Sequence, residues 1–278
     1  MPPLIIDCHA HVYGEDDKKY PPVDKPVRPP KGTGTVPHFR RQMNAAGVRY
    51  VTFVQPRTFY SFDNRFLLDT VREHKGWAAG VCTLDPDDPH SPGLLEQYVR
   101  TGTIRGLRSV PTAKGRLEDP GVVKLWERAG QLGIVVNAFI GREQAKELAA
   151  LLPRFPKLPV VLDHCLELKA GPDLDKTLAD VVRLARHPNL YAKLTFIPTG
   201  SAEKYPCRDM HEPCKQIIQA FGPRRCVWGS DFPCELWCPN VTYAQHLKIF
   251  TQELGLDAPT QEAVLGTTAR GLWFARRK

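Results

Sequence analysis

Eight short apolar runs, each bounded by turn residues, recur along this chain and alternate with amphipathic segments. Strands are expected at residues 4–8, 49–54, 77–83, 104–107, 134–139, 159–163, 190–194 and 225–228. Helical periodicity marks residues 37–46, 64–74, 121–132, 142–152, 174–186, 212–221, 243–254 and 261–274. Eight such repeats in 278 residues favour an α/β fold, a single (β/α)₈ TIM barrel that forms one domain over residues 1–278. A doubly wound sheet uses the same alternation and is the alternative fold.

The first apolar run leads into Asp7-Cys8-His9-Ala10-His11. Because strand side chains alternate between faces, His9 and His11 are expected on the same face, roughly 6.5–7 Å apart along the strand. Two imidazoles with this spacing can converge on one metal ion or on one substrate. A lone histidine at a strand end is more often structural, but the pair is predicted to be functional.

Two later strand ends offer partners for this pair. His164 follows Asp163 after one apolar run, and Asp231 lies in Trp228-Gly229-Ser230-Asp231-Phe232-Pro233 after another. In a barrel the catalytic groups gather at the C-terminal ends of the strands, and the first and last strands are neighbours. We therefore expect one site that contains His9, His11, His164 and Asp231. Asp163 is expected to orient His164 as an outer contact. The alternatives are that His164 is a structural residue and that Asp231 only caps a helix.

Several cations and one further histidine are candidates for contact with a substrate. Arg108, at the end of the fourth strand, is predicted to clamp a carboxylate. His211, in the loop after the seventh strand, is predicted to contact substrate or donate a proton, with helix capping as the alternative. The proline-rich loop 12–36 is expected to wall the pocket from the opposite side. Weaker candidates for binding an anionic substrate are Arg57, Lys193 and Lys114.

Composition excludes several classes of partner. The net charge is +8, but no run of five or more Lys/Arg and no nucleic-acid-binding motif is present, so a small anionic substrate is favoured over a polyanion. No apolar run approaches the ~18 residues of a membrane span. A cytoplasmic enzyme with reduced cysteines is therefore expected, and homo-oligomerisation is left open. A second metal site or a disulfide would require that two late loops meet, those carrying Cys207, Cys214, Cys234 and Cys238.

Taken together, these motifs resemble the amidohydrolase superfamily, in the branch that includes 2-pyrone-4,6-dicarboxylate lactonases, sugar-lactone hydrolases and, more distantly, aromatic-acid decarboxylases. The resemblance covers nearly the whole chain. It is carried by residues 5–11, Gln55-Pro56, Asn64, and residues 105–108, 160–164, 191–194, 221–225 and 228–233.

The resemblance implies a hydrolase with at most one divalent metal ion. Binuclear members of the superfamily carry a bridging lysine and an extra histidine, whereas the fifth strand here offers Asn137-Ala138-Phe139. The expected ion is zinc, held by His9, His11, Asp231 and His164, although some lactonases of this branch work without a metal.

The chemistry of these groups predicts hydrolysis of a lactone or a similar ester. Asp231 would take a proton from water and pass it to the leaving alkoxide. The three imidazoles, or a metal ion, would stabilise the negative charge on the carbonyl oxygen. Two alternatives remain open at this stage. They are a lyase that decarboxylates an aromatic or unsaturated acid with the same residues, and a barrel that only binds a small acid.

Overall fold

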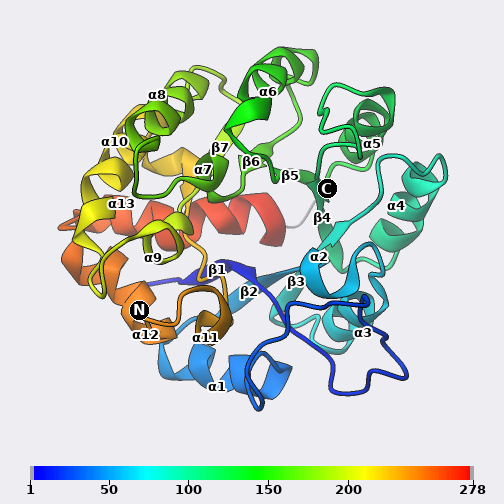
Figure 1. Cartoon of the computed structure of the whole chain (residues 1–278), viewed down its shortest axis with the longest axis horizontal. Helices are drawn as coiled ribbons and strands as arrows, with labels where there is room; N and C mark the ends of the chain where they lie inside the picture. Colours follow the sequence, from blue (N-terminus) through cyan, green and yellow to red (C-terminus); the bar gives the residue numbers. More distant parts are fainter. Residues whose placement is uncertain (1–2, 276–278) are drawn as a thin grey trace.

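The structure, a computed structural model that describes residues 3–275, is an eight-stranded parallel β-barrel with helices around it (Figure 1). The strands lie in chain order, and each of them pairs in parallel with the next. The fold is thus the predicted (β/α)₈ barrel. Its strands are β1 (Ile6–Ala10), β2 (Tyr50–Val54), β3 (Ala78–Thr83), β4 (Ile104–Ser109), β5 (Val135–Ala138), β6 (Val160–Leu162), β7 (Leu190–Lys193) and β8 (Cys226–Val227).

Backbone contacts between the first strand and the segment after β8 close the barrel. Ala10 forms a parallel bridge with Phe232, and the N–H of His11 donates to the Phe232 carbonyl over 2.7 Å. The register of β1 against β2 shifts between Asp7 and Ala10, which marks a β-bulge around His9. Bulges re-aim side chains and are frequent beside active sites. Closure therefore brings the histidine pair next to the segment that follows β8, as predicted.

Thirteen α-helical segments are present among the described residues. Three of them, α1, α12 and α13, begin with a side-chain cap. Thr35 accepts from the N–H of His38 at the start of α1, and Thr242 and Gln245 form a capping box on α12. The helices are α1 (Val36–Ala45), α2 (Arg57–Tyr60), α3 (Arg65–Glu73), α4 (Ser91–Arg100), α5 (Pro120–Gln131), α6 (Ala145–Leu151), α7 (His164–Glu167), α8 (Leu174–Leu184), α9 (Phe196–Gly200), α10 (His211–Phe221), α11 (Cys234–Trp237), α12 (Tyr243–Lys248) and α13 (Ala258–Glu262).

The C-terminal helical segment crosses one end of the barrel, as Figure 1 shows in red. Its residues Ala269, Leu272 and Trp273 pack in one buried cluster with side chains from the strands, Ile6 and Val227 among them. This apolar plug seals the barrel interior at that end. The functional side chains described below lie at the opposite, C-terminal ends of the strands, which is where barrel enzymes place their chemistry.

All eight predicted strands begin and end within three residues of the observed ones, but the helices were predicted less completely. The helix α4, whose first turn contains Pro92 and Gly93, was not predicted. The predicted final helices contain π-helical turns at Ile249–Glu253, Ala263–Thr267 and Arg270–Phe274. Short 3₁₀ turns lie at Arg142–Gln144, Leu152–Arg154, Arg208–Met210 and Pro223–Arg225.

The long loop after β1 is folded against α2. The N–H of Val23 donates to the Phe59 carbonyl over 2.9 Å, and that of Val27 donates to the Thr58 carbonyl over 3.1 Å. The loop therefore supports α2 from outside. Across residues 3–275 the structure has no helix with the length and apolar character that a membrane crossing requires.

Candidate active site

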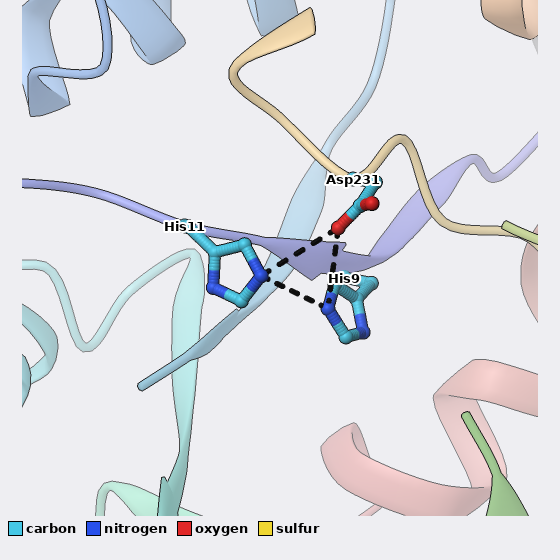
Figure 2. A group of neighbouring side chains, drawn as sticks. All are labelled: His9, His11 and Asp231. Atoms are coloured by element: carbon cyan, nitrogen blue, oxygen red, sulfur yellow. Dashed lines mark hydrogen bonds and ion pairs between the residues drawn. The ribbon is translucent and has the colours of Figure 1, made fainter. Parts of the chain in front are cut away.

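His9, His11 and Asp231 form a compact triangle at one end of the barrel (Figure 2). The Nε2 atoms of the two histidines are 3.1 Å apart. Oδ1 of Asp231 lies 3.4 Å from Nε2 of His9 and 3.5 Å from Nε2 of His11. All three side chains are buried or nearly so. The structure thus brings together the pair from β1 and the carboxylate that follows β8.

The turn after β8 is held tightly against β1, and this fixes the place of Asp231. Asp231 has a positive φ of 53°, which is uncommon for a residue other than glycine, and its N–H donates to the His9 carbonyl over 2.8 Å. Gly229 permits the close approach, because a Cβ there would lie 2.7 Å from Cβ of His9. The buried carboxylate of Asp7 accepts from the backbone N–H and the hydroxyl of Ser230, at 2.9 and 2.6 Å.

Asp231 is ionised at neutral pH. Burial by itself would raise the pKa of this carboxyl, but His164, His11 and Arg108 lower it to about 2. The pKa of His9 is well below its ordinary range because of burial and the charge of Lys193. An oxygen that is anionic at neutral pH therefore lies beside imidazoles, where it can accept a proton from a bound water molecule.

His164 reaches the same site from an unusual backbone conformation. Residues 164–167 all have positive φ, with 53° at His164, so α7 is a left-handed turn. Such a turn costs roughly 1–2 kcal/mol per residue. Nδ1 of His164 lies 2.7 Å from the Thr195 hydroxyl, and Nε2 lies 3.3 Å from Nη2 of Arg108. Because arginine only donates, Nε2 accepts and the proton is on Nδ1. Burial lowers the pKa of His164 to about 4, so the ring is neutral.

A buried charge network lies directly behind these imidazoles. Asp163 receives hydrogen bonds from Nε of Arg108 at 3.1 Å and from Asn137 at 3.2 Å, and it pairs with Lys193 at 2.7 Å. Burial would raise the pKa of Asp163, but Lys193 and Arg108 hold it below its ordinary value. The expectation that Asp163 orients His164 directly is wrong, because Nδ1 of His164 lies against the Thr195 hydroxyl instead.

The triangle opens into a cavity of about 400 Å³. Its wall carries a mixture of charged and aromatic side chains. The guanidinium of Arg108 stacks 3.9 Å from the ring centroid of Phe139. Arg57 has no ion-pair partner among the described residues, and burial together with the charge of Arg108 lowers its pKa. A cavity with two adjacent guanidinium groups favours an anionic ligand. The remaining lining residues include Lys169, Glu167, Phe196, Leu168 and Trp237.

A wider groove of about 1190 Å³ adjoins this cavity between α6 and α8. It shares Glu167 and Lys169 with the smaller cavity, but it is lined by neither the histidines nor Asp231. The chemistry therefore belongs to the smaller cavity.

The structure places four sequence predictions away from the cavity wall. Lys193 is fully buried beneath His9, at 3.2 Å from its Nδ1, and cannot contact a substrate there. Lys114 is exposed in a turn that Ala113 ties to Asp87 through a 2.7 Å hydrogen bond. His211 does not line the cavity, and its Nε2 lies 2.7 Å from the Pro206 carbonyl at the start of α10. Loop 12–36 likewise does not line it, because it packs outside α2.

Three residues of the site were missed from the sequence. Thr195 orients His164 through a hydrogen bond, and Phe139 stacks against the Arg108 guanidinium. The ring centroid of Trp237 lies 6.2 Å from that of His11. Thr195 and Phe139 follow the ends of β7 and β5, so their position after a strand was an available signal. Trp237 lies in α11, a single short turn in the loop after β8, and had no comparable signal.

The ligand atoms of the triangle fit a single metal ion. Ligands about 2.0–2.1 Å from a tetrahedral ion lie roughly 3.3–3.4 Å apart, close to the three separations found here. His11 has the usual outer contact of a ligand, because its Nδ1 lies 2.8 Å from the Val54 carbonyl. His164 does not join this group, and its role as a ligand stays a prediction.

Comparison with known proteins adds a family and several relatives. A family model described as amidohydrolase matches residues 6–275. L-fucono-1,5-lactonase of Burkholderia ambifaria is 26% identical over 176 residues, which are 62% of this chain and 60% of that relative. 4-Sulfomuconolactone hydrolase of Rhizobium radiobacter is 22% identical over 247 residues, which are 84% of this chain and 77% of that relative. The aligned segment thus spans less than two thirds of the first of these two relatives.

Among solved structures, a candidate 2-pyrone-4,6-dicarboxylic acid hydrolase from Acinetobacter baumannii, with citric acid bound, has the same fold. The TM-score is 0.81 at 18% identity, and the match covers 96% of this chain and 98% of that one. At this level of identity the likeness establishes the barrel architecture alone.

Proposed function

This chain belongs to the amidohydrolase family, and from that premise we propose that it hydrolyses a small, anionic lactone or a similar cyclic ester. Family membership and lactone-hydrolysing relatives make it a hydrolase. One observation carries the finer proposal. The ionised Asp231 carboxylate lies within 3.5 Å of two imidazoles, in a cavity whose wall holds the guanidinium groups of Arg57 and Arg108.

Asp231 is the group that moves the proton in the proposed reaction. Its carboxylate accepts a proton from the water molecule whose oxygen bonds to the lactone carbonyl carbon. The ring C–O bond then breaks, and Asp231 returns that proton to the leaving oxygen. The products are one hydroxyl group and one carboxylic acid, which releases its own proton to solvent at neutral pH. Asp231 thus acts first as general base and then as general acid.

The charge that develops on the carbonyl oxygen needs hydrogen-bond donors in the cavity. Arg108 has donors left over, because its Nη1 has no hydrogen-bond partner among the described residues. His164 has its proton on Nδ1 toward Thr195, so its Nε2 serves to position Arg108.

Two imidazoles and one carboxylate form a ligand set that favours zinc. His9, His11 and Asp231 would hold it, and when bound it would lower the pKa of water and polarise the carbonyl.

Arg57 offers the cleanest test of substrate charge, because its side chain has no ion-pair partner among the described residues. We expect Arg57→Met to raise KM for an anionic lactone by about tenfold or more, with little change in kcat, since a charge-assisted hydrogen bond contributes about 1.5–3 kcal/mol. A neutral sugar lactone should be affected much less. Steady-state kinetics on both substrates measure the difference, and an equal loss for both would assign Arg57 a purely structural role.

The pH profile follows from the lowered pKa values. His164 titrates at about 4 and Asp231 at about 2, so both are in their active forms down to about pH 5. We expect kcat/KM to be level between neutral pH and about pH 5, and to decline only below that as His164 becomes protonated. Initial rates across this range measure it. A decline centred near the ordinary histidine pKa of about 6.5 would contradict this assignment.

The function itself is tested by assaying purified protein on a panel of substrates. The panel contains 2-pyrone-4,6-dicarboxylate, 4-sulfomuconolactone, L-fucono-1,5-lactone and a hydroxylated aromatic acid. We expect ring opening of the anionic lactones, slower opening of the neutral sugar lactone, and no carbon dioxide from the aromatic acid. Carbon dioxide release without any ring opening would favour a lyase instead.

A further inference from the structure

Lys193 has an unusual place for a lysine. It is fully buried at the end of β7, inside the barrel, with its ammonium 5.6 Å from the ring centroid of Trp273 in the apolar plug. Nζ lies 2.7 Å from Oδ1 of Asp163 and 3.2 Å from Nδ1 of His9. A buried lysine is ordinarily tolerated only when paired, and Asp163 supplies that partner. The ion pair with Asp163 accounts for the burial of Lys193, but it does not require the contact with His9.

The contact decides where His9 carries its proton. An ammonium group has three donors and no acceptor, so Nδ1 of His9 must accept, and the proton of the neutral ring is then on Nε2. A histidine that binds a metal usually has the opposite arrangement, in which Nδ1–H donates to a carboxylate or a carbonyl. The carboxylate here is Asp163, but its Oδ2 is 3.9 Å from Nδ1 of His9, beyond hydrogen-bond distance.

His11 has that usual arrangement, and the two rings form one consistent chain of hydrogen bonds. Nδ1 of His11 donates to the Val54 carbonyl at 2.8 Å, which leaves its Nε2 as an acceptor. The N–H at Nε2 of His9 can then donate to this atom across 3.1 Å. The direction runs from Lys193 through His9 and His11 to Val54, and every donor meets an acceptor.

We propose that Lys193 is a positioning residue that fixes the proton of His9 on Nε2. This has two consequences. The N–H of His9 points into the site, where the carbonyl oxygen of a lactone would replace Nε2 of His11 as its acceptor, a role that rests on the proposed function. The same proton opposes the binding of a metal ion at His9, His11 and Asp231, and this second consequence does not depend on any reaction.

Zinc affinity tests the proposal without an activity assay. We expect Lys193→Met, whose side chain is also unbranched but is one atom shorter and lacks the donor, to bind Zn²⁺ about tenfold or more tightly than the unmodified protein, the scale on which outer contacts change metal affinity. Titration against a chromophoric chelator measures the affinity. Adding His11→Ala to Lys193→Met should abolish the gain, which locates the ion.

Arg108→Met is the control for the loss of a nearby cation that, like Lys193, also contacts Asp163. It removes a cation that acts on His9 and on Asp231, but it leaves Nδ1 of His9 untouched. We expect a clearly smaller gain in Zn²⁺ affinity from this variant. An equal gain from both variants, or no gain from Lys193→Met, would overturn the proposal.

The proton itself can be observed in the unmodified protein, which keeps the proposal falsifiable if Lys193→Met does not fold. Long-range ¹H–¹⁵N correlation spectra of ¹⁵N-histidine-labelled protein distinguish the two neutral tautomers, and a His9→Gln spectrum assigns the signal. We expect His9 to be protonated at Nε2 and His11 at Nδ1. A His9 protonated at Nδ1 would overturn the role of Lys193 while leaving lactone hydrolysis by Asp231 standing. Failure of the activity panel would overturn lactone hydrolysis while leaving the role of Lys193 standing.

Discussion

An Asp231→Asn variant is expected to lose lactone hydrolysis almost completely, with kcat reduced by about 10²–10⁴, the range that general acid–base catalysis contributes. The amide keeps the size and shape of the side chain, but it cannot take a proton from water. It also removes the anionic member of the triangle, so any Zn²⁺ bound with His9 and His11 should bind more weakly. Steady-state rates with an anionic lactone, together with a chelator titration, measure both effects.

The matched control for this variant is His211→Asn. His211 lies outside the cavity and contacts the Pro206 carbonyl, so we expect unchanged turnover from its replacement. Melting temperatures of both variants show whether the fold is intact. Turnover near the unmodified level in Asp231→Asn, with the melting temperature unchanged, would remove this carboxylate from the mechanism.

The second large effect is expected from Arg108→Met. Arg108 donates to Asp163 and to His164, stacks on Phe139, and still faces the cavity. Its loss removes a contact with the substrate anion and also the donor that orients the His164 ring. At about 1.5–3 kcal/mol for each hydrogen bond to a charged group, kcat/KM should decrease by about 10²–10³. The decrease should appear in kcat as well as in KM.

Arg57→Met provides the comparison, because it should change KM without a comparable change in kcat. Substrate charge separates the two contributions further. With a neutral lactone, Arg108→Met should still lose kcat through His164, whereas Arg57→Met should behave almost like the unmodified protein. If Arg108→Met changes only KM, and only for anionic lactones, its contacts with Asp163 and His164 have no part in the reaction.

The barrel and the core of the site could be predicted from the sequence because both depend on local patterns. Apolar runs and turn residues mark the strands, and a closed barrel makes the first and last of them neighbours. These two facts were sufficient to predict that His9 and His11 lie beside Asp231. The spacing of the His pair along β1 was similarly sufficient to place both rings on one side, although a β-bulge accompanies it.

Other features depend on contacts between distant segments and had no local signal. Nothing in the sequence near His164 indicates a left-handed turn over four residues. The sequence indicates that Lys193 is a cation at a strand end, where it could contact a substrate. In the structure its side chain points into the barrel and contacts Asp163 and His9 instead. His211 was assigned from its loop alone, and a hydrogen bond to Pro206 holds it outside the cavity.

The central claim is that water, activated by Asp231, opens a lactone at its carbonyl carbon. Hydrolysis in H₂¹⁸O under single-turnover conditions, followed by mass spectrometry of the product, tests this claim most directly. The account predicts one ¹⁸O atom in the new carboxylate and none in the new hydroxyl group, with no labelled product formed by Asp231→Asn. Label in the hydroxyl group, or labelled product formed equally well by Asp231→Asn, would contradict it.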